Sequence, residues 1–167
     1  LEDDLTFGAG HGSVLNEDGD TEMDACIVDG TTLGAGAVAA VGNIANPVSL
    51  ARRVMEKTPH VLLVGSGAQA FARSEGVAHV PTDELVTAVV RQQFAEFKAK
   101  YPNAVLNQFN RGNPGHDTVG AVALDRCGRL AAATSTGGIT NKMRGRVGDS
   151  PIVGCGAIAD NSLGAVS

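Results

Sequence analysis

The chain has 167 residues, enough for one domain with a buried core, and 43% of them are hydrophobic, as in soluble globular proteins. A formal net charge of −5 and an aromatic content of 4% argue against nucleic-acid binding, which needs a positive surface and usually stacking rings. No apolar run is as long as a membrane span, and the first residues do not resemble a signal peptide, so no membrane partner is expected.

The three cysteines are widely separated, odd in number and without a C-x-x-C spacing. This pattern argues against a disulfide framework or a zinc site, so we expect small buried side chains. Reduced cysteines favour a reducing compartment, and we therefore expect a cytoplasmic protein.

An acidic and then glycine-rich loop at residues 1–11 opens the chain. Short strands are then predicted at 13–15, 24–28 and 33–41, with a turn at 16–20 between the first two. The sequence of the third strand, LGAGAVAAV, indicates packing so close that only glycine and alanine fit on part of it.

Helical spacing begins at Asn46 and Pro47, an asparagine cap followed by proline at the first helical position. A short buried strand at 61–64 is expected next, and then a turn and a helix that ends near Glu75. The clearest helical pattern covers 82–101, where apolar residues share one face. They are Leu85, Val86, Val89, Val90, Phe94 and Phe97.

Periodicity is lost over residues 102–117, which predict an exposed, mobile linker, and it returns abruptly at Thr118. Residues 118–124 and 129–136 predict two strands of a β-hairpin. The strands and helices together predict a single domain of the α/β class. The change from a polar segment to a strand that begins with threonine is the sharpest boundary in the chain.

Three motifs follow this boundary: DTVGAVALD at 117–125, AAATSTGG at 131–138 and NKMRGRVGDSP at 141–151. Each alone is weak, because threonine is common in strands and a Thr/Ser/Gly run is usually a turn. Together with residues 7–16, 22–30 and 45–65 they resemble the plant-type asparaginases, or isoaspartyl aminopeptidases, whose near relative is glycosylasparaginase. The resemblance covers nearly the whole chain except the segment before Thr118.

The resemblance implies a four-layer α-β-β-α sandwich of the N-terminal-nucleophile hydrolases, present here as one partial catalytic domain. Residues 1–117 would belong to the α-subunit, and residues 118–167 would begin the β-subunit. Members of the family form dimers of such α/β heterodimers. By the same resemblance, a strand and a helix precede Leu1 in the family, and the oxyanion hole follows Ser167, so we expect a truncation at both ends.

The resemblance also implies the chemistry. The bond between Asp117 and Thr118 would break autocatalytically, and Thr118 would become an N-terminal nucleophile whose own amine, with an intrinsic pKa of about 8, acts as the base. Thr136 would hydrogen-bond the nucleophile, Arg146 would bind the substrate's α-carboxylate, and Asp149 its α-ammonium group. The expected activity is hydrolysis of isoaspartyl dipeptides and of the side-chain amide of L-asparagine.

The resemblance requires no cofactor, but the N-terminal loop is similar to a family loop whose backbone carbonyls bind a structural sodium ion. The aligned positions are Leu1, Glu2, Asp4, Phe7, Ala9 and His11. Carbonyl ligands leave almost no sequence signature, so an ordinary loop is the alternative. The family usually has asparagine at the position of Gly8, and its absence predicts weaker processing or activity.

Two other functions compete with this one. The pair His116-Asp117 before the nucleophile is similar to glycosylasparaginases, whereas Thr136-Gly137-Gly138 favours the isoaspartyl peptidases. An uncleaved, inactive interaction protein is compatible with Gly8 and with the expected truncations. Cleavage before Thr118 separates this last alternative from the two enzymes.

Overall fold

The structure is a computed structural model that describes residues 1–100 and 116–167, with the backbone alone at 116 and 117. Its elements are β1 (Met23–Asp29), β2 (Ala35–Val41), α1 (Pro47–Lys57), β3 (Leu62–Val64), α2 (Gly65–Ser74), α3 (Thr82–Leu85), α4 (Ala88–Lys100), β4 (His116–Leu124), β5 (Leu130–Ile139), β6 (Ile158–Asp160) and β7 (Gly164–Val166). The linker expected at 102–117 lies outside the described residues as far as residue 115. None of the described helices is long and apolar enough to cross a membrane.

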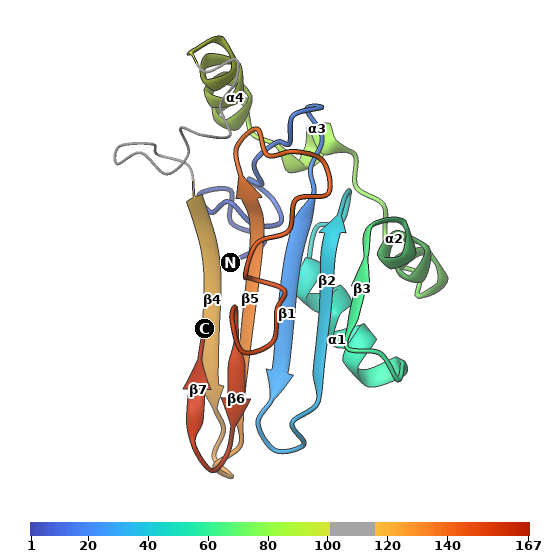
Figure 1. The fold of residues 1–167 in the computed structure, drawn as a ribbon, viewed down its shortest axis with the longest axis vertical. Coiled ribbons are helices and arrows are strands. Elements are labelled where there is room, and N and C mark those ends of the chain that lie inside the picture. The colour runs from blue at the N-terminus through green and yellow to red at the C-terminus, as the bar shows by residue number, and fades with distance from the viewer. Residues whose placement is uncertain (101–115) are drawn as a thin grey trace.

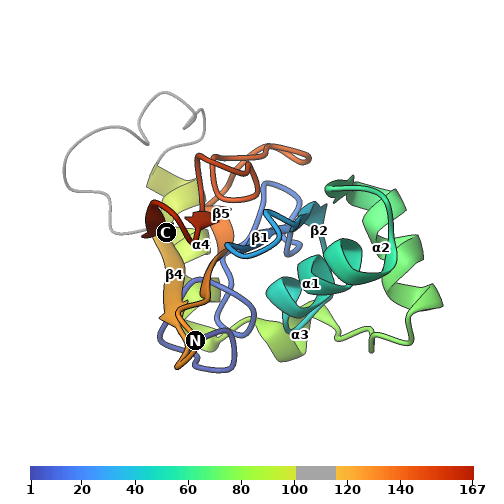
Figure 2. The same cartoon turned by 90° about the horizontal axis from the view of Figure 1, so that it is seen from below.

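Five strands form one mixed sheet in the order β3-β2-β1-β5-β4, in which only the β2–β3 pair is parallel. Helix α1 lies against one face, and the chain after β5, with the β6–β7 hairpin, lies across the other (Figure 1, Figure 2). Alternate residues of β1 therefore enter different cores: Ala25 packs with the α1 side, and Cys26 with the hairpin side. The predicted α/β class is confirmed.

Helix α1 packs directly on the backbone of β2. A Cβ atom at Gly36 would lie 2.1 Å from the carbonyl oxygen of Ala51 and 2.6 Å from the amide nitrogen of Met55. The close packing predicted from the LGAGAVAAV sequence is confirmed, because no side chain fits between the two backbones at this position.

We expect Gly36→Ala to lower the free energy of unfolding by about 1–3 kcal/mol, since the added methyl group must push α1 away from the sheet. Urea unfolding measures the change. The matched control is Gly67→Ala in α2, where an added Cβ meets no atom within 4 Å. The control should be neutral or stabilising by up to about 1 kcal/mol, as expected when glycine is replaced in a helix. Equal stability of the two variants would contradict the close contact.

The prediction of one long helix over 82–101 is wrong in one respect, because the structure has two helices there, α3 and α4. Val86 has extended backbone angles (φ −105°, ψ 126°), which end α3. The hydroxyl of Thr87 then accepts the amide hydrogen of Val90 at 3.2 Å and replaces a missing backbone partner at the start of α4. The change of direction leaves Leu85 buried but Val89 exposed, so the six apolar residues do not share one face.

Two strand predictions need correction. The strand at 61–64 exists as β3, but it is exposed rather than buried, because it forms the edge of the sheet and pairs with β2 alone. Residues 13–15 form no strand. They pass beside Gly137 of β5, whose Cβ position lies 2.9 Å from the amide nitrogen of Val14, and the next residue, Gly138, has a positive φ of 79°.

Helix α1 begins at Pro47 as predicted, but Asn46 does not cap it with its side chain. The side-chain amide of Asn46 instead donates to Asp3, and the carboxylate of Glu2 accepts the amide hydrogen of Val48 at 3.0 Å. The cap therefore comes from the N-terminal loop, which sequence spacing does not indicate.

The prediction of buried cysteines holds only for Cys26, whose pKa burial raises to about 11. Cys127 and Cys155 are exposed. Cys127 lies in the β4–β5 turn, where its backbone amide donates a hydrogen bond to the carboxylate of Asp125. Its exposure follows from its place at the tip of a hairpin.

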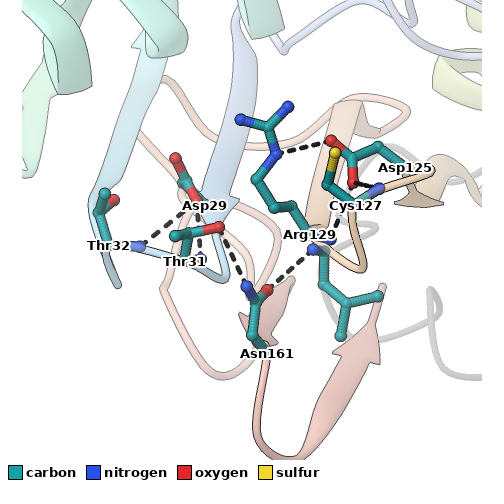
Figure 3. Close-up of polar contacts among 8 residues, drawn as sticks. Asp29, Thr31, Thr32, Asp125, Cys127, Arg129 and Asn161 are labelled. Atoms are coloured by element: carbon teal, nitrogen blue, oxygen red, sulfur yellow. Dashed lines mark hydrogen bonds and ion pairs between the residues drawn. The ribbon is translucent and has the colours of Figure 1, made fainter.

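The turns at one end of the sheet are joined by a polar network (Figure 3). Asn161, in the β6–β7 turn, accepts the amide hydrogen of Leu130 at 2.8 Å and donates to the hydroxyl of Thr31 at 3.1 Å. Asp125 binds the side chain of Arg129 across the β4–β5 turn at 2.6 Å. This network ties three turns together at the end of the sheet opposite to Thr136.

Candidate active site

Thr118 of β4 and Thr136 of β5 face each other across the antiparallel ladder. The hydroxyl of Thr118 donates to the hydroxyl of Thr136 at 3.2 Å. Thr136 is only 3% exposed, and its oxygen also accepts the amide hydrogen of Gly138 at 2.9 Å. Thr118, in contrast, is exposed. One hydroxyl is thus held by its surroundings, and the other is accessible to a ligand.

The β4–β5 ladder is irregular beside these threonines. Its register shifts between His116 and Thr118, so that Gly137 and Gly138 both face the single residue Asp117. The amide hydrogen of Gly137 leaves the ladder and donates to the carbonyl oxygen of Gly8 at 2.6 Å. This hydrogen bond joins the N-terminal loop to β5 next to Thr136.

The structure brings Arg146 to the same place. Its Nη1 atom lies 3.4 Å from the position that a Cβ atom of Gly138 would occupy, and 3.1 Å from that of Gly148. The guanidinium group therefore occupies the space left by two glycines. Since Gly138 also donates to Thr136, Arg146 adjoins the paired threonines.

Asp149 follows Gly148 in the same loop, and its side chain is exposed. The next residue, Ser150, is fixed to the sheet because its carbonyl oxygen accepts the hydroxyl of Thr134 at 2.6 Å. Thr134 and Thr136 are on the same face of β5, as alternate residues of a strand. Among the described residues no ion pair joins Asp149 to Arg146, although both lie in this loop.

Two buried charges beside the threonines were missed by sequence reasoning. Asp24 is the partner of Thr136 on β1 and is 0% exposed, and Lys142 is 1% exposed. Burial raises the pKa of Asp24, while the positive charge of Lys142 opposes the shift. Burial lowers the pKa of Lys142, opposed by Asp24. The signal in the sequence was an acidic residue inside the otherwise apolar run of β1.

The N-terminal loop is joined to the sheet through Glu2. Its Oε1 atom accepts the hydroxyl of Ser135 at 2.5 Å as well as the amide hydrogen of Val48. Burial raises the pKa of this carboxyl group, and the hydrogen bond from Ser135 acts in the opposite direction. Ser135 immediately precedes Thr136, so the loop is anchored next to the threonine pair.

The same loop contains the carbonyl groups considered for a metal ion. Those of Leu1, Glu2 and Asp4 each accept a backbone amide hydrogen within the loop, from Asp4, His11 and Phe7 respectively. A Cβ atom at Gly12 would lie 2.6 Å from the carbonyl oxygen of Phe7 and 2.7 Å from that of Leu5, so two carbonyl oxygens converge on the backbone of Gly12. In the described part of the chain, no three His, Cys, Asp or Glu side chains are grouped to hold a metal ion.

The fold and the site together define a mixed α/β protein with an exposed threonine, a buried threonine and an arginine at one end of the β4–β5 hairpin. The chain belongs to the asparaginase family: a family model described as Asparaginase matches residues 1–167. The resemblance drawn from the three motifs is confirmed.

Curated relatives agree. The isoaspartyl peptidase/L-asparaginase of Mus musculus is 58% identical over 167 residues, which cover 100% of this chain and 50% of that protein. The protein of the same name from Homo sapiens is 55% identical, with coverage of 100% and 53%. The isoaspartyl peptidase of Salmonella typhimurium is 50% identical, with coverage of 96% and 52%. The chain spans about half the length of the curated relatives it matches.

Proposed function

We propose that the full-length protein hydrolyses isoaspartyl peptides and the side-chain amide of L-asparagine, with Thr118 as its nucleophile. The observation that carries this proposal is the 3.2 Å hydrogen bond between the hydroxyls of Thr118 and Thr136. The names of the relatives, isoaspartyl peptidase and L-asparaginase, support the substrate class.

The reaction begins with cleavage of the bond between Asp117 and Thr118. The hydroxyl of Thr118 attacks the carbonyl carbon of Asp117, the C–N bond breaks as an ester forms, and the released amine takes up a proton. Water then hydrolyses the ester, which leaves a carboxylate on Asp117 and the free α-amine and hydroxyl on Thr118. This amine, with a pKa of about 8, removes the proton of its own hydroxyl at neutral pH. The irregular register at Asp117 supports this step, because a peptide bond outside the regular ladder keeps fewer backbone hydrogen bonds to break.

In the second reaction the oxygen of Thr118 attacks the β-carbonyl carbon of the substrate. Ammonia leaves from asparagine, or the amino group of an amino acid or peptide leaves from an isoaspartyl bond. Water then hydrolyses the acyl-enzyme and releases aspartate. Thr136 orients the hydroxyl of Thr118, and Gly138 holds Thr136 in turn.

Arg146 and Asp149 form a clamp for the α-groups of the substrate. The guanidinium group binds the α-carboxylate through two hydrogen bonds, and Asp149 binds the α-ammonium group. With both α-groups bound, only the side-chain carbonyl of the substrate reaches Thr118. The position of Arg146 next to Gly138 supports this arrangement.

The whole protein is proposed to be a four-layer α-β-β-α sandwich, with residues 1–117 in the α-subunit and residues 118–167 at the start of the β-subunit. The β6–β7 hairpin would begin the second sheet. Exposed apolar residues of β4 and of the hairpin support this, since a second layer would cover them. They are Val122, Leu124, Ile158, Leu163 and Val166. We propose a dimer of α/β heterodimers.

A structural sodium ion is proposed in the N-terminal loop, held by the backbone carbonyls of residues 1, 2, 4, 7, 9 and 11. The fit rests on the carbonyl oxygens of Phe7 and Leu5, which converge beside Gly12. An oxygen-only ligand set suits a hard cation. The ion would stabilise the loop that Glu2 anchors beside Thr136.

Mass spectrometry of the full-length protein tests the proposal. Two chains, the second beginning at Thr118, are expected, together with release of aspartate from a β-aspartyl dipeptide. Release from glycosylated asparagine instead would identify a glycosylasparaginase. A chain that stays intact on long incubation and releases aspartate from neither substrate would contradict both enzymes and favour an interaction protein.

Gly8 provides a further test. Its carbonyl oxygen binds Gly137 next to Thr136, and the resembling family usually has asparagine at this position. We expect Gly8→Asn to accelerate the cleavage before Thr118 by about tenfold, because a well-placed side-chain hydrogen bond is worth about 1 kcal/mol or more. The fraction of cleaved chain is followed with time by gel electrophoresis. Gly8→Ala is the control. Equal cleavage rates for Gly8→Asn and Gly8→Ala would exclude a role for the side-chain amide of asparagine.

A further inference from the structure

Asp24 and Lys142 are buried charges for which the proposed mechanism has no use. Among the described residues, Lys142 is the largest whose side chain is fully buried. Its Nζ atom donates to the carbonyl oxygen of Glu22 at 2.6 Å. The carboxylate of Asp24 accepts the amide hydrogen of Ala40 at 2.8 Å. A buried ion is costly unless neighbouring groups compensate it, so these partners explain how the pair is tolerated.

Both charges adjoin Arg146. The Nζ atom of Lys142 lies 2.9 Å from the Cβ position of Gly138, and Nη1 of Arg146 lies 3.4 Å from the same point. The two cations therefore lie beside one glycine, where they repel each other. Asp24 interacts electrostatically with both and offsets this repulsion.

The loop that carries Arg146 is held on both sides by acidic residues at the start of β1. The amide hydrogen of Gly145 donates to the carboxylate of Glu22 at 2.9 Å, and that of Gly148 donates to Asp24 at 3.5 Å. Lys142 in turn holds the backbone of Glu22. The backbone on either side of Arg146 thus depends on the same few charges.

We propose that Asp24 and Lys142 are positioning residues that hold Arg146 for the α-carboxylate of the substrate, and that Lys142 thereby sets the preference for substrates that carry this charge. The inference rests on the proposed function. Without Lys142, the carboxylate of Asp24 becomes the nearest uncompensated anion and competes with the substrate for Arg146. The hydroxyl of Thr118 bonds to that of Thr136, and variants at Asp24 and Lys142 keep this hydrogen bond.

The test uses the full-length protein and two substrates: L-asparagine and L-asparaginamide, in which a neutral amide replaces the α-carboxylate. We expect Lys142→Met to lower kcat/KM for asparagine by about tenfold to a hundredfold, mainly through KM. The kcat/KM for asparaginamide and the rate of cleavage before Thr118 should each change by less than about twofold. The control is Arg144→Met. The side chain of Arg144 lies on the same loop and is 73% exposed, so this variant should change kcat/KM for neither substrate.

A second variant guards against misfolding. Lys142→Met combined with Asp24→Asn also removes the competing carboxylate, and it should therefore recover part of the preference for asparagine. Equal losses for both substrates would reveal a purely structural role and overturn the inference. So would an unchanged preference in Lys142→Met, or a double variant that loses the preference as far as the single variant does. A wild-type protein that hydrolyses neither substrate would instead overturn the proposed function, and this inference with it.

Discussion

Replacement of Thr118 by alanine is expected to leave a single uncleaved chain and to lower hydrolysis of a β-aspartyl dipeptide by a factor of about 10⁴ or more. The effect is large because the variant loses two steps at once. Without the hydroxyl the bond after Asp117 has no internal nucleophile, and without cleavage no free amine is available as base. Thr136 alone offers a hydroxyl that is already bonded to Gly138 and buried.

Mass spectrometry and a coupled assay for aspartate provide the measurements. Thr118→Ser is the matched control: it keeps the hydroxyl and should still cleave, although more slowly because serine is less restricted in its rotamer. Thr136→Val should cleave and react slowly, since it keeps the shape but loses the hydrogen bond to Thr118. Cleavage of Thr118→Ala at the same bond would contradict the assignment of the nucleophile.

Replacement of Arg146 by leucine is expected to lower kcat/KM for L-asparagine by about 10²–10³. The loss corresponds to about 3–4 kcal/mol, the cost expected when a charge-assisted, two-point contact with a carboxylate disappears. Cleavage before Thr118 should proceed at nearly the rate of the unchanged protein, because that step involves no free α-carboxylate.

Steady-state kinetics with asparagine measure this effect, and the cleaved fraction is determined on the same samples. Arg146→Lys is the control: it keeps the charge but not the planar fork, and it should recover only part of the activity. Loss of cleavage together with activity would assign Arg146 a structural role in the loop that crosses Gly138, and would exclude its proposed role in substrate binding.

Several elements were correctly predicted because their signals are local. The hairpin around residues 125–128 follows from β-branched residues on either side of a turn, and the start of α1 follows from a proline at the first helical position. The close contact at Gly36 was also visible in the sequence, since a strand made of glycine and alanine has almost no side chain to keep a neighbouring helix at a distance.

The errors came from places where distant segments decide the local structure. Thr87 is a local exception, because its hydroxyl accepts the amide hydrogen of Val90 and starts a second helix within a continuous helical pattern. Glu2, far from α1 in the sequence, caps that helix and displaces Asn46 from the role. An edge strand such as β3 is apolar enough to be taken for a buried one, and only the strand order shows that it has a single neighbour.

The motifs were enough to identify the family and to single out Thr118 and Thr136 as candidate site residues, because motifs of this length and order occur together in few other contexts. How these residues meet depends on the tertiary fold. Strand register placed Thr118 opposite Thr136, and two glycines left the space for Arg146. The structure also shows that Asp24 and Lys142 are buried beside the two threonines. Burial and charge compensation depend on what packs around a side chain, and the spacing of residues along a chain does not specify its neighbours in space.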